Sequence, residues 1–160
     1  MYKSAVEILS AIGNGEISSV EILTSYLKRI EKINPEINAV VQLDTDRAME
    51  RAQKADKALS SGDSWGSLHG LPMTVKDAFE VSGIVSTGGA KVWKNHIPET
   101  NAEAVQKLIN AGAIIFGKTN VPLFSADIQT FNDIYGTTNN PWDITKTPGG
   151  SSGGPAAAVA

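Results

Sequence analysis

The chain has 160 residues, of which 41% are hydrophobic, and its formal net charge is −3. This length is enough for one domain with a hydrophobic core, and the charge balance lacks the basic excess typical of proteins that bind nucleic acid or membrane surfaces. The chain contains no cysteine, which excludes disulfide bonds, thiolate nucleophiles and cysteine-based zinc sites. It contains only two histidines, so we expect neither a metal site nor a cofactor.

The sequence carries no recognisable targeting or membrane segment. The N-terminus lacks the basic and then apolar pattern of a signal peptide. No uninterrupted apolar stretch reaches the length that is needed to span a bilayer. We therefore expect a soluble, cytoplasmic protein with no nucleic acid and no membrane among its partners.

Residues 1–62 are predicted to be largely helical. A first helix is expected over residues 4–12, because the Gly-Asn-Gly that follows would end it. Apolar residues at helical spacing predict a second helix over residues 20–33. Ser18 and Glu21 have the spacing of a capping box at its start. Both helices are expected to bury one apolar face in the core.

The remainder of this region adds a strand and a third helix. Asn34-Pro35 is expected to end the second helix, because a residue before proline disfavours helical geometry. A strand is predicted over residues 37–43, and an Ala- and Lys-rich helix over residues 44–62. We expect the helices to pack against the second region, residues 63–160.

The second region follows a strand, helix and strand order. An apolar strand at residues 73–75 would deliver Lys76 and Asp77 at its end. A helix over residues 102–110 and a strand over residues 113–116 come next. This alternation predicts an α/β fold, in which N-terminal helices pack on the first part of a mixed β-sheet.

One stretch satisfies the letters of a nucleotide-binding P-loop but not its mechanism. Residues 112–119 are GAIIFGKT, which fits GxxxxGK[ST]. A P-loop needs a phosphate-binding loop between its glycines and a helix that begins at its lysine. Here the intervening residues are apolar, and Pro122 stands where the first helical turn would be. We predict a core strand that ends in a turn, and no nucleotide site.

Lys76 is a candidate for chemistry because it follows an apolar strand. Burial disfavours an ammonium ion and lowers its pKa, which can make the amine a general base near neutral pH. A lysine at the edge of a sheet can instead extend into solvent. Asp77 need not pair with it, because neighbours in a strand point to opposite faces. The local sequence alone favours the lysine that extends into solvent.

Residues 149–154, GGSSGG, are the second candidate. Glycines allow backbone amides to approach a ligand closely, and two serines there could offer hydroxyls at a defined point. The following Pro and Ala residues favour the start of a helix, where N–H groups can bind an anion. The local sequence alone favours a flexible linker or an ordinary helix cap for these residues.

Three segments resemble the amidase signature family, in order from about residue 68 to residue 160. They read HGLPMTVKDAFEVSGIVSTGG, GAIIFGKTNVP and YGTTNNPWDITKTPGGSSGGPAAAVA. The resemblance implies a Ser–cis-Ser–Lys triad that hydrolyses carboxamides. Lys76 matches the family's catalytic lysine, and Ser151 matches the bridging serine, which follows a cis peptide bond in the family. We therefore expect Lys76 to be largely buried, with its amine within hydrogen-bonding distance of Ser151.

The resemblance also assigns supporting and substrate-binding residues. In the implied mechanism, Ser151 accepts a proton from the nucleophilic serine while neutral Lys76 holds the proton of Ser151. Residues 123–130 correspond to a loop that lines the acyl pocket in relatives. The expected supporting residues are Ser152, Gly149, Gly150, Gly153 and Gly154, and the expected substrate-binding residues are Leu123, Phe124 and Ser125.

The family places the nucleophilic serine and the oxyanion-hole amides further along the chain than residue 160. We therefore expect these 160 residues to be inactive alone and to represent the first part of an amidase. The expected partner is a small-molecule amide substrate. Association into a homo-oligomer, or through surface exposed by a truncation, is a further expectation.

The sequence also bears on the kind of amidase. The segment TNVPLFSADIQTFNDIYGTTNNPWD resembles stand-alone amidases more than the A subunit of the glutamyl-tRNA amidotransferase, which typically carries a TNMDEF-like stretch there. We therefore favour a stand-alone amidase. The alternatives are a fragment of that amidotransferase and a truncated, non-catalytic interaction protein.

Overall fold

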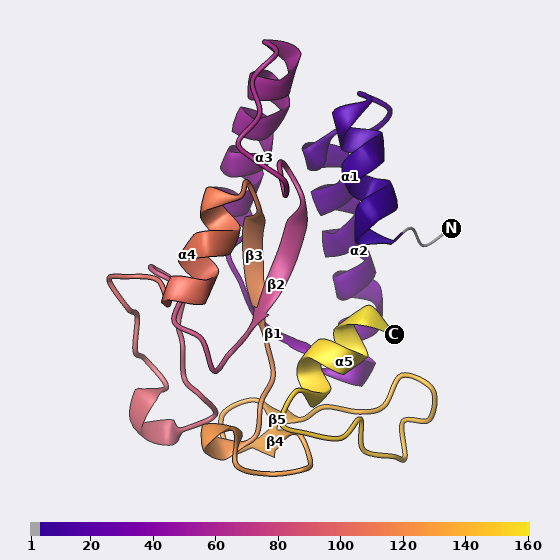
Figure 1. Cartoon of the computed structure of the whole chain (residues 1–160). Helices are drawn as coiled ribbons and strands as arrows, with labels where there is room; N and C mark the ends of the chain where they lie inside the picture. The colour runs from indigo at the N-terminus through magenta and orange to yellow at the C-terminus, as the bar shows by residue number, and fades with distance from the viewer. Residues whose placement is uncertain (1–3) are drawn as a thin grey trace.

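The computed structural model describes residues 4–160 and combines α-helices with a small mixed sheet (Figure 1). The elements are α1 (Ala5–Gly13), α2 (Ser19–Ile37), β1 (Val40–Leu43), α3 (Thr45–Ser60), β2 (Pro72–Lys76), α4 (Glu103–Asn110), β3 (Ile114–Thr119), β4 (Phe131–Asn132), β5 (Gly136–Thr137) and α5 (Gly153–Val159). Two 3-10 turns, η1 (Lys91–Trp93) and η2 (Leu123–Ser125), lie in the connections. The predicted α/β class is confirmed.

The main sheet has the strand order β1-β3-β2. The central strand β3 runs antiparallel to β1 and parallel to β2. The parallel pair is joined by a crossover that contains α4, as parallel neighbours require. Thr119 of β3 therefore pairs with Val40 on one side and with Lys76 on the other. The sheet joins both halves of the chain, and a boundary at residue 62 stays a prediction.

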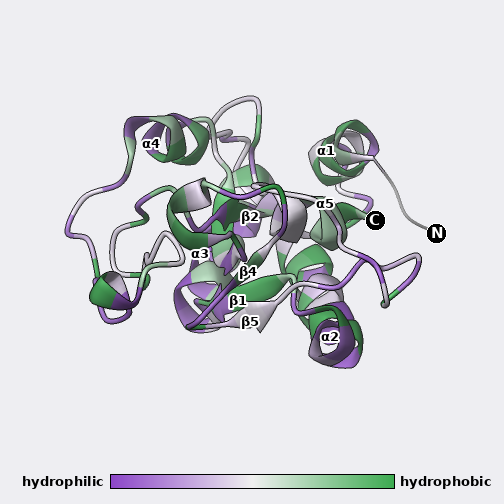
Figure 2. Cartoon of the chain, turned by 90° about the horizontal axis from the view of Figure 1, so that it is seen from below, coloured by the Kyte–Doolittle hydropathy of each residue, from purple (hydrophilic) through white to green (hydrophobic). Residues whose placement is uncertain are grey.

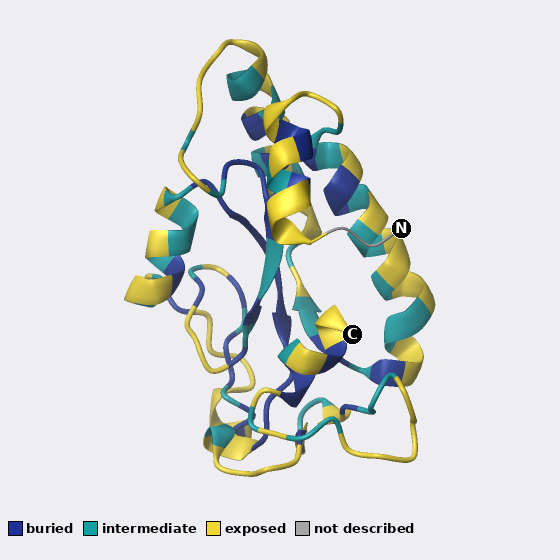
Figure 3. Ribbon diagram, turned by 45° about the vertical axis from the view of Figure 1, so that its right-hand side comes forward, coloured by how far each residue is buried: buried dark blue, intermediate teal, exposed yellow. Residues whose placement is uncertain are grey.

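Alternation along β3 divides the core between the two faces of the sheet. Ile114 and Phe116 point to the face that packs on α2 and α3, where small alanines of α3 allow close approach. Ile115 points to the other face, where it meets Val105 of α4. Figure 3 shows dark blue and teal strands between helices whose outer sides are yellow. All of β3 is buried, as expected for a central strand.

The helices are amphipathic, and their starts follow the sequence signals. In Figure 2, α1, α2 and α4 each carry both green and purple residues. The capping box of Ser18 and Glu21 at the start of α2 is confirmed, and Ser4 and Glu7 form a second one at α1. No helix in the described part of the chain is long and apolar enough to cross a membrane.

The predicted end of the second helix is wrong. Helix α2 continues through Pro35 to Ile37 and ends at Asn38, which adopts a left-handed conformation with φ of 54°. The Asn34 side chain accepts hydrogen bonds from the amides of Ala39 and Val40 at 2.9 and 2.8 Å. These bonds support the chain as it leaves the helix, so a proline in the last turn is tolerated. The predicted strand 37–43 is consequently shortened to β1.

The P-loop interpretation is excluded by the position of GKT. Gly117, Lys118 and Thr119 belong to strand β3, so the predicted core strand is confirmed and extends three residues further than expected. No helix follows the lysine; η2 comes next, and a long irregular segment then leads to α5. Figure 1 shows α5 beside the lower end of the sheet. This packing brings the GGSSGG segment to the end of β2.

Candidate active site

Lys76, the last residue of β2, connects the strand to the serine loop. Its Nζ donates hydrogen bonds to Ser151 Oγ at 2.8 Å and to Ser152 Oγ at 3.0 Å. The expected distance to Ser151 is therefore confirmed. Lys76 is of intermediate burial, neither fully enclosed nor exposed, which is consistent with the expected burial. The strand ends at this residue, and its long side chain reaches the serine loop.

The surroundings of Lys76 lower the pKa of its amine. Partial burial lowers the pKa of the Lys76 amine below its ordinary value of 10.5, because removal from water disfavours the ammonium ion. Its two hydrogen-bond partners are hydroxyl groups, which can both accept and donate protons. A neutral amine can then hold a proton for a serine hydroxyl, which is the behaviour of a general base.

The serine loop is ordered and is not a linker. The Gly150–Ser151 peptide bond is cis, as the family resemblance implies. Ser152 precedes α5 but makes no side-chain cap bond to it, so the ordinary helix-cap interpretation does not hold. Gly154 packs directly on the backbone after β3, and a Cβ there would lie 2.3 Å from the Asn120 carbonyl oxygen. Only glycine allows this approach of α5 to the sheet.

A buried ion pair between Lys118 and Asp77 lies next to the end of β2. Lys118 and Asp77 are 0% and 1% exposed, and Lys118 Nζ donates to Asp77 Oδ1 at 3.0 Å. Lys118 also donates to Ser86 Oγ at 2.8 Å, and Thr87 Oγ1 donates to Asp77 at 2.6 Å. Burial lowers the pKa of Lys118, and the charge of Asp77 opposes that shift. Asp77 therefore pairs with Lys118, whereas the amine of Lys76 bonds to the two serines.

The predicted substrate-binding residues form η2 and present apolar surface. Leu123 and Phe124 are about half exposed, and the Phe124 ring stacks edge-on against Trp93 with centroids 5.5 Å apart. Phe124 and Ser125 both have positive φ, of 52° and 57°. The Ser125 hydroxyl is buried and has no hydrogen-bond partner among the described residues. Sequence reasoning missed Trp93, which no motif marks; the substrate-binding role of η2 stays a prediction.

The contacts of the two histidines indicate structural roles. His69 is buried; its Nδ1 accepts from the Trp65 amide at 3.0 Å, and its Nε2 lies 3.1 Å from the Ala55 carbonyl oxygen. His96 is exposed beside Glu80. Within residues 4–160, no group of three His, Cys, Asp or Glu side chains is placed to hold a metal ion.

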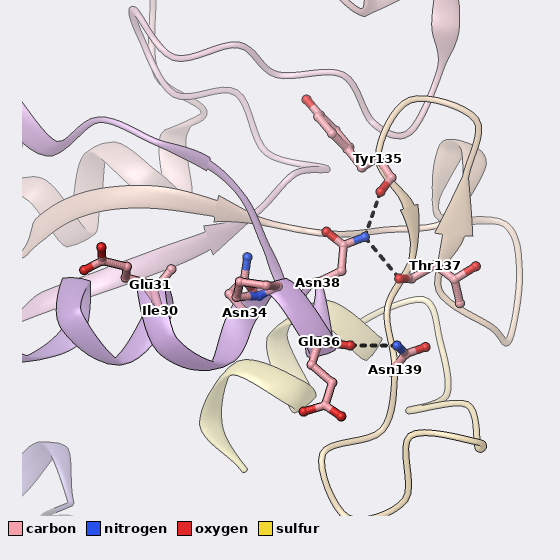
Figure 4. Close-up of a pocket in the computed structure, with 9 residues that line it drawn as sticks. Ile30, Glu31, Asn34, Glu36, Asn38, Tyr135, Thr137 and Asn139 are labelled. Atoms are coloured by element: carbon pink, nitrogen blue, oxygen red, sulfur yellow. Dashed lines mark hydrogen bonds between the residues drawn. The ribbon is translucent and has the colours of Figure 1, made fainter.

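An open cavity of about 500 Å³ lies between the end of α2 and strand β5, away from the Lys76 cluster (Figure 4). Hydrogen bonds across it join the two elements: Asn38 donates to the carbonyl oxygens of Tyr135 and Thr137, and Asn139 donates to that of Glu36. Its lining includes none of the predicted site residues. We assign the cavity to the packing of the loop on α2.

The fold and the Lys–Ser–Ser cluster agree with a family match. The sequence profile of the Amidase family matches residues 21–160. Known hydrolases of this class superpose on nearly the whole chain. The chain belongs to the amidase signature family.

The sequence relatives include the A subunit of glutamyl-tRNA(Gln) amidotransferase from two bacteria. The protein of Acidothermus cellulolyticus is 40% identical over 158 residues, which are 99% of this chain and 31% of the relative. That of Desulfatibacillum aliphaticivorans is 45% identical over 145 residues, which are 91% of this chain and 30% of the relative. The chain thus spans about a third of the length of the curated relatives it matches.

The solved structures include amidases with other names. A bacterial aryl acylamidase of the amidase signature family has a TM-score of 0.93 and 33% identity, covering 99% of this chain and 33% of its own. The peptide amidase of Stenotrophomonas maltophilia has a TM-score of 0.92 and 29% identity, covering 98% of this chain and 34% of its own. The comparisons thus include both amidotransferase components and amidases of other names, and they do not decide between a stand-alone amidase and an amidotransferase subunit.

Proposed function

We propose that this chain supplies the lysine and the bridging serine of an amidase that hydrolyses carboxamides to a carboxylate and ammonia or an amine. The observation that carries the proposal is the 2.8 Å contact between Lys76 Nζ and Ser151 Oγ. The lowered pKa of Lys76 supports it, because a neutral amine has a lone pair for the proton of Ser151. The protein would act in the cytoplasm on a small-molecule amide.

The proposed relay moves one proton through two hydroxyls. A nucleophilic serine, which the family places beyond residue 160, attacks the amide carbonyl and passes its proton to Ser151 Oγ. Ser151 passes its own proton to Lys76 Nζ. The relay runs back to protonate the leaving nitrogen, the C–N bond breaks, and an ester to the serine remains. Water then attacks that ester in the same way and releases the carboxylate.

Ser152 and the glycines have supporting roles in this proposal. The hydrogen bond from Lys76 to Ser152 at 3.0 Å fixes the direction of the amine without placing Ser152 in the relay. Gly149 has φ of 85°, a conformation that a side chain would strain. The apolar surface of η2 would contact the acyl part of the substrate.

The decisive experiment is Ser151→Ala in the full-length protein that contains this sequence, assayed with a simple aryl amide. Loss of the relay should lower kcat by roughly 10²- to 10⁴-fold, the usual contribution of general acid–base catalysis. Ser61→Ala, an exposed serine just after α3, is the matched control and should keep the wild-type rate. A wild-type rate for Ser151→Ala would disprove the proposal, as would turnover by the 160-residue chain alone that Ser151→Ala abolishes.

A second candidate function rests on the sequence relatives. Identities of 40% and 45% to amidotransferase components suggest an amidase whose released ammonia is used to amidate glutamyl-tRNA(Gln). The assay is formation of glutaminyl-tRNA(Gln) by the full-length protein with its candidate partner proteins. Amidation that depends on Ser151 would support this candidate. Hydrolysis of simple amides without amidation would support a stand-alone amidase.

A further inference from the structure

A single buried hydroxyl holds both sides of the serine loop. Thr130 is 1% exposed and lies just before β4, far from the loop in sequence. Its Oγ1 donates to the Gly149 carbonyl oxygen at 2.9 Å and accepts from the Gly153 amide at 3.0 Å. These two glycines stand two residues before and two residues after Ser151. The hydroxyl thus uses its donor and its acceptor capacity to close the loop around the serine.

The backbone around Thr130 forms a closely fitted seat for the same loop. A Cβ on Gly150 would lie 2.6 Å from the Ile128 carbonyl carbon and 2.7 Å from the Asp127 carbonyl oxygen. A Cβ on Gly153 would lie 2.3 Å from Thr130 Oγ1. Loop and seat therefore meet largely through backbone atoms and the Thr130 side chain. Such contacts leave little freedom for the loop to shift.

We propose that Thr130 is a positioning residue that sets the place of Ser151 Oγ relative to Lys76 Nζ. The inference rests on the proposed proton relay. Ser151 must lie within hydrogen-bonding distance of the lysine and also face the nucleophile, and a misplacement of about 1 Å can cost around 10²-fold in rate. Thr130 touches no reacting atom, so it acts through the loop alone.

Thr130 is itself fixed from the other side. Its carbonyl oxygen accepts from the Thr138 amide at 2.9 Å, next to the β4–β5 pairing. Thr138 is also fully buried, and its hydroxyl donates to the Asn38 carbonyl oxygen at 2.7 Å and accepts from Asn120 at 3.0 Å. These bonds lead to α2 and to the end of β3, and not to the serine loop. Thr138 therefore resembles Thr130 in its burial and in the two hydrogen bonds of its hydroxyl, but its hydroxyl does not bond to the serine loop.

The test is Thr130→Val in the full-length protein, with Thr138→Val as the matched control. Valine keeps the shape of threonine and removes both bonds to the loop. We expect kcat for an aryl amide to fall roughly 10- to 100-fold with KM changed less than about threefold. Thr130→Ser, which keeps the hydroxyl, should recover most of the rate. Thr138→Val should lower the melting temperature without a comparable loss of kcat.

Three outcomes would overturn the inference. The first is Thr130→Val with kcat within about twofold of wild type, which would leave Thr130 a purely structural residue. The second is an equal loss of kcat in Thr138→Val, which would reflect general destabilisation. The third is a Thr130→Ser variant no better than the valine variant. Each of these leaves the effect of Ser151→Ala unchanged, so a failure here differs from failure of the proposed function.

Should Ser151→Ala prove fully active, or no turnover be found, crystal structures decide the inference without a rate. The proposal predicts that Ser151 Oγ moves out of hydrogen-bonding distance of Lys76 Nζ in Thr130→Val and keeps that distance in Thr138→Val. An unchanged distance in Thr130→Val contradicts it.

Discussion

Two lysines stand side by side at the ends of β2 and β3 and differ in their partners. In the register of the parallel pair, Lys118 lies opposite Val75, and Lys76 lies opposite Thr119. Burial lowers the pKa of both amines. Lys118 is fully enclosed and bonded to a carboxylate, whereas Lys76 is partly exposed and bonded to two hydroxyls.

The partner decides what each lysine can do. A carboxylate stabilises the ammonium ion and accepts its hydrogen bond permanently, which suits a structural role. A hydroxyl can accept a proton from one neighbour and give its own to another, which suits a relay. Asp77 directly follows Lys76 in the chain but bonds to Lys118, so these two neighbouring residues belong to different clusters.

The largest expected effect is on the rate of amide hydrolysis, and it comes from a substitution that removes the neutral form of residue 76. Lys76→Arg keeps a long basic side chain, but arginine does not lose its proton in proteins and so cannot supply the neutral form. We expect amide hydrolysis by the full-length protein to fall roughly 10²- to 10⁴-fold, as for loss of a general base. Steady-state kinetics with an aryl amide measure this. Wild-type activity in Lys76→Arg would show that the lysine acts only as a cation.

The second-largest expected effect is a loss of stability, and it concerns Lys118. Lys118→Met leaves Asp77 as a buried, unpaired charge, and removing one partner of a buried ion pair costs about 3–5 kcal/mol. Urea unfolding should show this loss for Lys118→Met. The double variant Asp77→Asn with Lys118→Met removes both charges and should recover much of the stability. A double variant as unstable as the single one would place the cost in packing instead of charge.

The smallest effect is a pH dependence of stability. Because the pKa of Lys76 is lowered in the fold, the unfolded chain binds more protons between that lowered value and 10.5. Stability contributed by Lys76 should therefore rise with pH through this window. Tyr26 and Tyr135 have raised pKa values and also contribute to the pH dependence of stability. The difference in unfolding free energy between wild type and Lys76→Met removes their contribution and leaves that of Lys76. A difference that is flat or falls with pH would contradict the lowered pKa.

Local signals predicted the elements better than the contacts between them. The capping box at Ser18 and the apolar run before Lys76 are properties of neighbouring residues, and both were found from the sequence. The end of α2 was predicted too early, at Asn34-Pro35. The bonds from the Asn34 side chain that support the true helix end depend on how the next residues turn. Helix propensity describes an average tendency, and the hydrogen bonds of the Asn34 side chain override it here.

The site was predicted from a resemblance and not from the physics of the sequence. Local reasoning favoured a surface lysine at position 76, and only the family motif joined Lys76 to Ser151. The pairing of Lys118 with Asp77 and the bonds of Thr130 were not predicted at all. They join residues 41 and 19 or more positions apart, so no periodicity or spacing carries them.

The pairing of β3 with both neighbours has a consequence for how the chain folds. Strand β1 is made early, yet its partner β3 is synthesised much later, after β2 and α4. Until then β1 exposes unpaired backbone groups, which makes it prone to association with other chains. The helical contacts of α2 with α3 are local and can form first, whereas the sheet must await a slow, non-local closure. The strand that aligns the two lysines is therefore expected to set the pace of folding.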